Sequence, residues 1–166
     1  MAAAVDRRWV ESWTANADPS VPLSPMFLGA LEEQLRLEVD NVDAVLLAGP
    51  STGEPDLALK PVDTVSAGVR RARWWRHDVH AWAVDGGLLL IGQGLGRRWE
   101  VSVEVDDGYR GKGLGRALAR AARHVSPERR ALWAQIPPGD AAGMRAFLGA
   151  GYLPVGAEAL LLPRPL

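Results

Sequence analysis

The chain of 166 residues contains no cysteine, and this absence excludes several kinds of site at once. Without a thiol there is no disulfide framework, no zinc site with thiolate ligands, no iron–sulfur cluster and no cysteine nucleophile. The lack of cysteine also fits a reducing compartment, and we expect a cytoplasmic protein. The length is that of one domain, which can bury a core without covalent or metal support.

The chain also lacks an excess of charge and long apolar runs. Its 19 basic and 20 acidic residues give a net charge of −1, so no overall basic field favours nucleic acid. No apolar run approaches the roughly 20 residues of a membrane span, and none follows the N-terminal residues as in a secretory signal. We therefore expect no membrane and no nucleic-acid partner. The preference for arginine over lysine, together with abundant alanine, indicates a GC-rich, bacterial coding sequence.

The first half of the chain predicts little regular structure beyond one good helix. Residues 8–14 fit a short amphipathic turn, residues 42–47 a short buried strand and residues 49–61 a loop. A helix is predicted after Ser24 and Pro25, since a serine cap and a proline in the first turn are typical helix starts. Its apolar positions recur at steps of three and four residues: Met26, Phe27, Ala30, Leu31, Leu35 and Val39.

The second half changes to short strands with tight turns. A hairpin is predicted within residues 80–92 and a third strand over residues 99–105. In the third strand valine alternates with polar residues, so that Glu100, Ser102 and Glu104 share the face opposite the valines. These strands predict an antiparallel meander.

Helices and further strands follow the meander. The pattern predicts a helix from about residue 115 to 125, a strand over 132–136, a helix over 140–148, and closing strands at 152–155 and 158–162. The expected fold class is therefore mixed α/β, with an antiparallel front and a strand–loop–helix–strand unit behind it.

The segment Tyr109–Arg116 is the strongest candidate for a binding site. Its glycines at positions 111, 113 and 115 allow the backbone to approach a ligand closely. The segment opens a helix, whose first N–H groups and positive dipole end favour an anion. Arg110, Lys112 and Arg116 add positive charge. These features predict a pyrophosphate-binding loop; the alternative is a glycine-rich turn with solvated basic side chains.

Two common nucleotide-binding patterns do not fit this loop. The phosphate-loop pattern requires Ser or Thr after the lysine, but Gly113 follows Lys112. The dinucleotide pattern requires a third glycine where this chain has Arg116. Another glycine run, residues 92–96, has no helix after it, and we predict a turn there.

The pattern that does fit is Arg/Gln-x-x-Gly-x-Gly/Ala, which is met by Arg110, Gly113 and Gly115. In this loop, the valine strand before it and the amphipathic helix after it, the sequence resembles the GNAT (GCN5-related) N-acetyltransferase superfamily. In that superfamily the loop binds the pyrophosphate of acyl-CoA. The resemblance implies a GNAT-like fold: a central, mostly antiparallel twisted sheet flanked by helices. It also implies one domain, with residues 1–79 on the acceptor side and residues 80–166 binding acyl-CoA.

The resemblance further implies acetyl-CoA, or another acyl-CoA, as co-substrate, and no metal. The thioester arm would pair with the backbone of the strand before the loop, where an N–H group would also stabilise an oxyanion. The residues implied to bind the cofactor are Val103, Glu104, Val105, Arg110, Gly111, Lys112, Gly113, Leu114, Gly115, Arg116, Asp140 and Phe147.

The resemblance implies an N-acyltransferase that acts by direct transfer to a primary amine, of a small molecule or a protein, in a ternary complex. The amine must first lose a proton, and Glu104 or Glu100 could accept it. The alternative for both is an exposed strand face that carries carboxylates.

A second region is similar to the family but departs from it at two positions. Asp140 stands in place of an asparagine and Phe147 in place of a tyrosine, before Gly151 and Tyr152. Asp140 can still cap a helix, but Phe147 has no hydroxyl to protonate the leaving thiolate. Tyr109, Tyr152 or water would have to replace it. These departures keep open a second hypothesis, a catalytically degenerate acyl-CoA-binding regulatory module.

Three remaining features have weaker functional interpretations. The histidines His77, His80 and His124 form no recognisable metal set, although His80 could line the acceptor site. The cluster over residues 70–77 combines arginines with two tryptophans and could bind RNA or an aromatic substrate. The near-zero net charge favours instead a strand edge with solvated arginines and tryptophans packed on the sheet. The closing strands could pair with a second copy in a homodimer.

Overall fold

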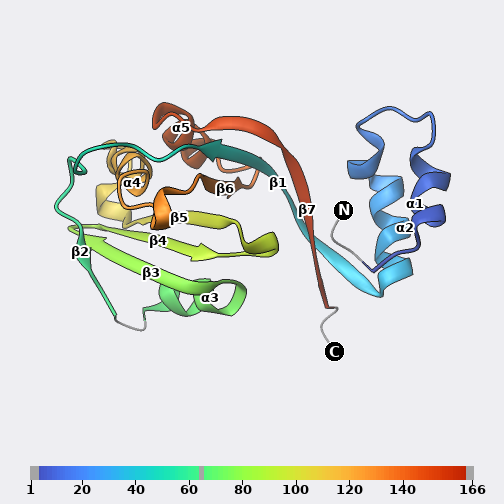
Figure 1. The fold of residues 1–166 in the computed structure, drawn as a ribbon, viewed down its shortest axis with the longest axis horizontal. Coiled ribbons are helices and arrows are strands. Elements are labelled where there is room, and N and C mark those ends of the chain that lie inside the picture. Colours follow the sequence, from blue (N-terminus) through green and yellow to red (C-terminus); the bar gives the residue numbers. More distant parts are fainter. Residues whose placement is uncertain (1–3, 64–65, 164–166) are drawn as a thin grey trace. The chain divides into compact units, whose positions relative to one another are not determined.

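In the computed structural model, which describes residues 4–63 and 66–163, the chain forms two compact units. One contains Met1–Asp43 and Ala157–Leu166, and the other contains Ala44–Gly156. The strands β1 (Leu37–Ala48) and β7 (Leu153–Pro163) each continue from one unit into the other (Figure 1). The single domain with a functional division after residue 79 remains a prediction. No helix in the described ranges is long and apolar enough to cross a membrane.

The smaller unit begins with two short helices, α1 (Arg7–Thr14) and α2 (Pro25–Leu35), with the single 3-10 turn η1 (Val21–Leu23) between them. The predicted cap is confirmed: the Ser24 hydroxyl accepts a hydrogen bond from the Phe27 N–H at 3.3 Å, with proline in the first turn. Aromatic rings of the two helices pack together. The rings of Trp9, Trp13 and Phe27 lie 5.6 to 6.1 Å apart, centroid to centroid.

The second helix is shorter than its apolar pattern predicts. It ends at Leu35, and Arg36 follows in the left-handed conformation (φ 55°). Val39, expected on the helix, lies in β1, where its N–H donates to the Glu32 carboxylate at 2.6 Å. Met26, expected to face the core, is exposed. The spacing of apolar residues therefore predicts a helix through Val39, but the chain forms strand β1 from Leu37 onward.

Asp43, in β1, carries a carboxyl group whose pKa is raised by partial burial and by the negative charges of Glu158 and Asp40. A raised pKa means that the ionised form opposes folding at neutral pH, and that this penalty disappears as the pH falls through the folded-state value. We expect Asp43→Asn to raise the melting temperature at pH 7, and the gain over the parent to shrink as the pH falls towards about 4. Thermal melts of both proteins across this range check it; a gain independent of pH would contradict it.

The sheet has the strand order β2-β3-β4-β5-β6-β1-β7 and is mostly antiparallel, as predicted. The meander of β3, β4 and β5 is confirmed, with β4 and β5 in register from Gly87↔Val105 to Gln93↔Trp99. β5 and β6 pair in parallel. The strands of the larger unit not yet defined are β2 (Lys60–Pro61), β3 (His77–Val84), β4 (Gly87–Gln93), β5 (Trp99–Val105) and β6 (Leu132–Ile136).

Helices cover both faces of this sheet, with α4 (Leu114–Ala122) and α5 (Ala141–Gly149) on one face and α3 (Ala67–Trp75) on the other (Figure 1). The alternation along β5 explains the arrangement. Val101 lies in the main core cluster beneath α4 and α5, and Val103 packs against it. The polar residues between the valines face α3. On the α3 side, a second, smaller cluster combines Val69 and Ala72 of the helix with Ala81 and Leu90 of the sheet.

Two expectations about strands are wrong. The arginine–tryptophan cluster forms α3, capped by the Ser66 side chain, and not a strand edge. Val69 and Ala72, three residues apart, are buried on its inner face, while Trp74 and Trp75 are 81% and 53% exposed and do not pack on the sheet. The two closing strands are one continuous strand, β7, because Gly156 is not among the glycines with positive φ and no turn forms there.

Candidate functional site

The glycine-rich segment connects β5 to α4 through the short turn η3 (Asp107–Tyr109). Two of its glycines, Gly111 (φ 73°) and Gly113 (φ 86°), adopt the left-handed conformation that residues with a side chain rarely enter. Beyond the neighbouring residues, no heavy atom lies within 4 Å of the position that a Cβ would take at either glycine. The loop therefore requires glycine for its backbone conformation and leaves open space above both positions.

The N-terminus of α4 is not capped by any side chain. The first hydrogen bond of the helix runs from the Ala117 N–H to the Gly113 carbonyl, at 3.0 Å. The N–H groups of the three residues before Ala117 therefore have no acceptor within the helix. These N–H groups and the positive end of the helix dipole favour an anion in front of Gly113.

Two basic side chains of the loop are used locally. The Arg110 guanidinium donates to the Val105 carbonyl at 3.2 Å and lies 2.9 Å from the Asp107 carboxylate. The Lys112 ammonium donates to the Gly108 carbonyl at 2.8 Å and lies 5.7 Å from the centre of the Tyr109 ring. Both cations therefore hold the loop in shape as well as adding positive charge.

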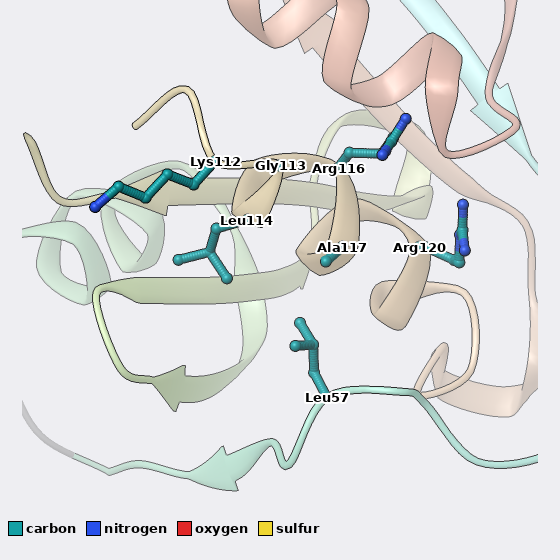
Figure 2. A pocket seen from close by; sticks show the side chains of 7 residues that line it. All are labelled: Leu57, Lys112, Gly113, Leu114, Arg116, Ala117 and Arg120. Atoms are coloured by element: carbon teal, nitrogen blue, oxygen red, sulfur yellow. The ribbon is translucent and has the colours of Figure 1, made fainter. Parts of the chain in front are cut away.

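A cavity of about 370 Å³ adjoins the N-terminal half of α4 (Figure 2). Figure 2 shows Leu57 facing the helix from the segment before β2, and Arg116 and Arg120 further along the helix. The lining residues are Leu57, Lys112, Gly113, Leu114, Arg116, Ala117 and Arg120. A second cavity of about 360 Å³ shares Leu57 and Leu114 with the first and reaches the turn of the β3–β4 hairpin. Open space therefore extends along α4 from the glycine loop.

The strand before the loop has an edge that is only partly paired. In the described chain, β5 pairs with β4 along its whole length but with β6 only at Trp99 and Glu100. The predicted cofactor-binding residues Val103, Glu104 and Val105 lie beyond this pairing, next to the loop. Their backbone edge towards β6 is therefore the place where a ligand in extended conformation can add itself to the sheet.

Glu100, one of the two candidate bases, is a buried carboxylate with two cationic partners. One oxygen lies 3.0 Å from Arg76 Nε and the other 2.8 Å from Arg98 Nε, and the residue is 5% exposed. Arg76 also donates to the Ser102 hydroxyl at 2.8 Å. Both carboxylate oxygens already accept charge-assisted hydrogen bonds, so the geometry is that of a structural ion-pair network.

Glu104, the other candidate base, is more accessible. One of its oxygens lies 2.8 Å from Arg71 Nη2, and the side chain is 40% exposed. Arg71 lies in α3. A second arginine of this helix, Arg73, forms an ion pair with Asp63, with Nη2 3.3 Å from Oδ1. Both arginine side chains are exposed, as expected, at 71% and 45%, although each also pairs with a carboxylate. The expectation of solvated arginines is wrong for Arg76, whose side chain is only 13% exposed beside Glu100.

The second family-like region is placed in and beside the core. The Asp140 side chain accepts a hydrogen bond from the Gly143 N–H at 2.8 Å and caps α5, as predicted. Phe147 and Tyr152 are buried, with their rings edge to face at 4.9 Å. Burial raises the pKa of the Tyr152 phenol, and its hydroxyl has no hydrogen-bond partner in the described residues. Tyr109, in contrast, is exposed at the loop.

A Tyr152→Phe variant tests whether this hydroxyl acts in catalysis. A buried hydroxyl without a partner contributes no favourable hydrogen bond, so we expect the variant to match the parent within about 1 kcal/mol in free energy of unfolding, or to exceed it. If the chain transfers an acyl group, as the resemblance implies, we expect the rate of transfer to be unchanged. Denaturant unfolding and steady-state rates measure the two quantities. A large loss of rate in a stable variant would make Tyr152 the proton donor.

The contacts of His80 and His124 are made outside the glycine loop. His80 stacks on Trp82 and lies 3.4 Å from the Asp78 carboxylate, and His124 contacts the Gly53 carbonyl at 3.1 Å. Within residues 4–63 and 66–163 no group of three His, Asp or Glu side chains is arranged to hold a metal ion.

Leu57, Ala117 and Arg120 belong to the cavity but were not among the predicted site residues. A signal for Arg120 exists in the sequence, because it follows Arg116 by four residues and so shares its helix face. Leu57 lies in a loop more than fifty residues away along the chain, and no local pattern places it beside α4.

Comparison with solved structures identifies the fold. The chain is similar to a GNAT-family protein from Novosphingobium aromaticivorans DSM 12444, with a TM-score of 0.53 and 18% identity over 78% of this chain and 68% of the other. It is also similar to a GCN5-related N-acetyltransferase from Kribbella flavida, with a TM-score of 0.52 and 18% identity. That match covers 88% of this chain but only 64% of the Kribbella chain, which is less than two thirds.

The family itself is shown by sequence. The pattern of the Acetyltransferase (GNAT) family matches residues 63–152, more than half of the chain, and the chain belongs to this family. The match includes the glycine loop and both helices that follow it. It begins at residue 63, before α3 and before the segment of residues 80–166 that the resemblance implies to bind acyl-CoA. No curated protein matches the sequence.

Proposed function

We propose that this chain is an acyl-CoA-dependent N-acyltransferase that transfers an acetyl group from acetyl-CoA to a primary amine by direct attack in a ternary complex. The observation that carries the proposal is the glycine loop with two left-handed glycines in front of an uncapped helix. The loop lies directly after β5, and β6 pairs with β5 only at Trp99 and Glu100, so β6 leaves the end of β5 next to the loop unpaired on that side.

The residues of the site suit the separate parts of acetyl-CoA. The N–H groups at the start of α4 would hold the pyrophosphate, with Arg116 beside them. The backbone of Val103–Val105 would hydrogen-bond the extended thioester arm. An N–H group at the same edge would stabilise the negative charge that develops on the thioester oxygen.

Glu104 is the residue that we assign to proton transfer from the amine. An ammonium has no lone pair, so it must lose a proton, directly or through water, before its nitrogen attacks. The C–N bond then forms, the C–S bond breaks, and the nitrogen loses its second proton to water. The sulfur takes up a proton from water or from the Tyr109 hydroxyl, which regains one from water. Glu100 is assigned instead to holding α3 against β5 through Arg76.

A thiol-release assay with a panel of amines tests this assignment. General acid–base catalysis contributes about 100-fold or more, so we expect Glu104→Gln to lower kcat by about that factor while acetyl-CoA binding is retained. Asp63→Asn is the matched control, since it also removes a carboxylate that pairs with an arginine of α3. If Glu104→Gln keeps the parent's rate from pH 6 to about 9, the base is another group.

A second candidate function is an acyl-CoA-binding regulatory module without turnover. Phe147 favours it, because this position carries no hydroxyl and lies within the core. Release of the CoA thiol distinguishes the two functions. Saturable acetyl-CoA binding without thiol release in the presence of any amine of the panel would identify the regulatory module.

A further inference from the structure

Two arginines extend the positive charge of the site along α4, beyond the glycine loop. Arg116 and Arg120 are exposed, four residues apart on one helix face, and both line the 370 Å³ cavity (Figure 2). In the described part of the chain neither forms an ion pair, whereas Arg71, Arg76 and Arg110 each do. Like charges at this spacing repel each other, so the pair is unfavourable until an anion binds between them.

Arg120 is too far along the helix for the pyrophosphate position itself. It follows Gly113 by seven residues, which corresponds to roughly 10 Å of helix. Its side chain lines the cavity at the end away from Lys112 (Figure 2). Leu57 forms an apolar wall opposite the helix. An anionic group bound beside Arg120 would therefore be a second phosphate of the ligand, separate from the pyrophosphate at the glycine loop.

Given the proposed function, we propose that Arg120, together with Arg116, binds the 3′-phosphate of coenzyme A and makes the protein prefer CoA species to 3′-dephospho-CoA. The guanidinium group suits this ligand, because its planar set of donors can bind two phosphate oxygens at once. The negative phosphate also removes the repulsion between the two arginines. The stem of Arg116 lies against Gly149 of α5, where an added Cβ would come within 2.9 Å of Arg116 Cδ, and this contact restricts its position.

Binding of CoA and of 3′-dephospho-CoA to the parent and to Arg120→Gln tests the proposal. One charge-assisted contact corresponds to about tenfold or more in affinity, so we expect the parent to bind CoA at least about tenfold more tightly. We expect Arg120→Gln to lose most of this preference by weakening CoA binding alone. Arg130→Gln is the control, because Arg130 is exposed and lies in the same unit but outside the cavity. This variant removes the same charge and should keep the preference for CoA.

Each other result overturns the proposal in a recognisable way. Equal affinity of the parent for both ligands would refute the 3′-phosphate site and leave the proposed function intact. The same holds if Arg120→Gln weakens both ligands equally, since the residue would then act on the pyrophosphate or on the whole helix. If neither ligand binds the parent, both this proposal and the proposed function fail.

Discussion

Replacing Gly113 by valine is expected to weaken acetyl-CoA binding by about 100-fold or more, the equivalent of two lost hydrogen bonds to a charged group. Gly113 has a φ of 86°, a conformation that a β-branched residue avoids. Its missing Cβ faces open space in front of the first N–H groups of α4. A valine there would therefore either occupy the pyrophosphate position or rotate these N–H groups away from it. Calorimetric titration with acetyl-CoA measures the dissociation constant.

Gly96→Val is the matched control for backbone strain. Gly96 also has a positive φ, of 65°, and also has no atom near the position of a Cβ, but it lies in the turn between β4 and β5. We expect both variants to lose stability to a similar degree, and only Gly113→Val to lose affinity. Normal acetyl-CoA affinity in a folded Gly113→Val protein would show that the loop is structural.

Removing the Glu100 carboxylate is expected to lower the free energy of unfolding by about 3–5 kcal/mol, as for other buried ion pairs that lose one partner. Glu100→Ala would leave the largely buried Arg76 guanidinium without the carboxylate that pairs with it. Arg76 follows the last residue of α3, so the loss should loosen the packing of α3 against the sheet. Urea unfolding followed by tryptophan fluorescence measures the effect.

Glu104→Ala provides the comparison, because Glu104 lies on the same strand face four residues further along β5. Its ion pair with Arg71 is largely exposed, and such pairs contribute about 0–1 kcal/mol. We therefore expect a small change in stability but a large loss of rate. If both alanine variants change stability equally, the assignment of Glu100 to structure and Glu104 to chemistry is wrong.

Local sequence signals predicted the elements that build the binding loop. The alternation of valine with polar residues defined β5, and the glycines after it marked the loop. Asp140 in front of α5 and Ser24 in front of α2 marked helix starts, and the structure shows both as caps. These features depend on residues close in sequence, whose spacing and backbone preferences act before any tertiary contact forms.

The contacts between distant segments could not be read in the same way. The ion pairs of the arginine cluster could not be predicted, because the carboxylates lie elsewhere in the chain: Glu104 pairs with Arg71 of α3, and Glu100 pairs with Arg76 just after the helix. Leu57 reaches the cavity from a loop without regular structure. Each of these placements depends on how the elements pack, which no local pattern contains.

A thermal-shift titration with acetyl-CoA and free CoA, with ATP and NAD as controls, tests the central claim most directly. A ligand that binds only the folded state raises the melting temperature once its concentration exceeds the dissociation constant. We predict a concentration-dependent increase with the two CoA species and none with ATP or NAD at equal concentration. A cooperative melt that no CoA species shifts would contradict the claim that the glycine loop in front of α4 binds acyl-CoA.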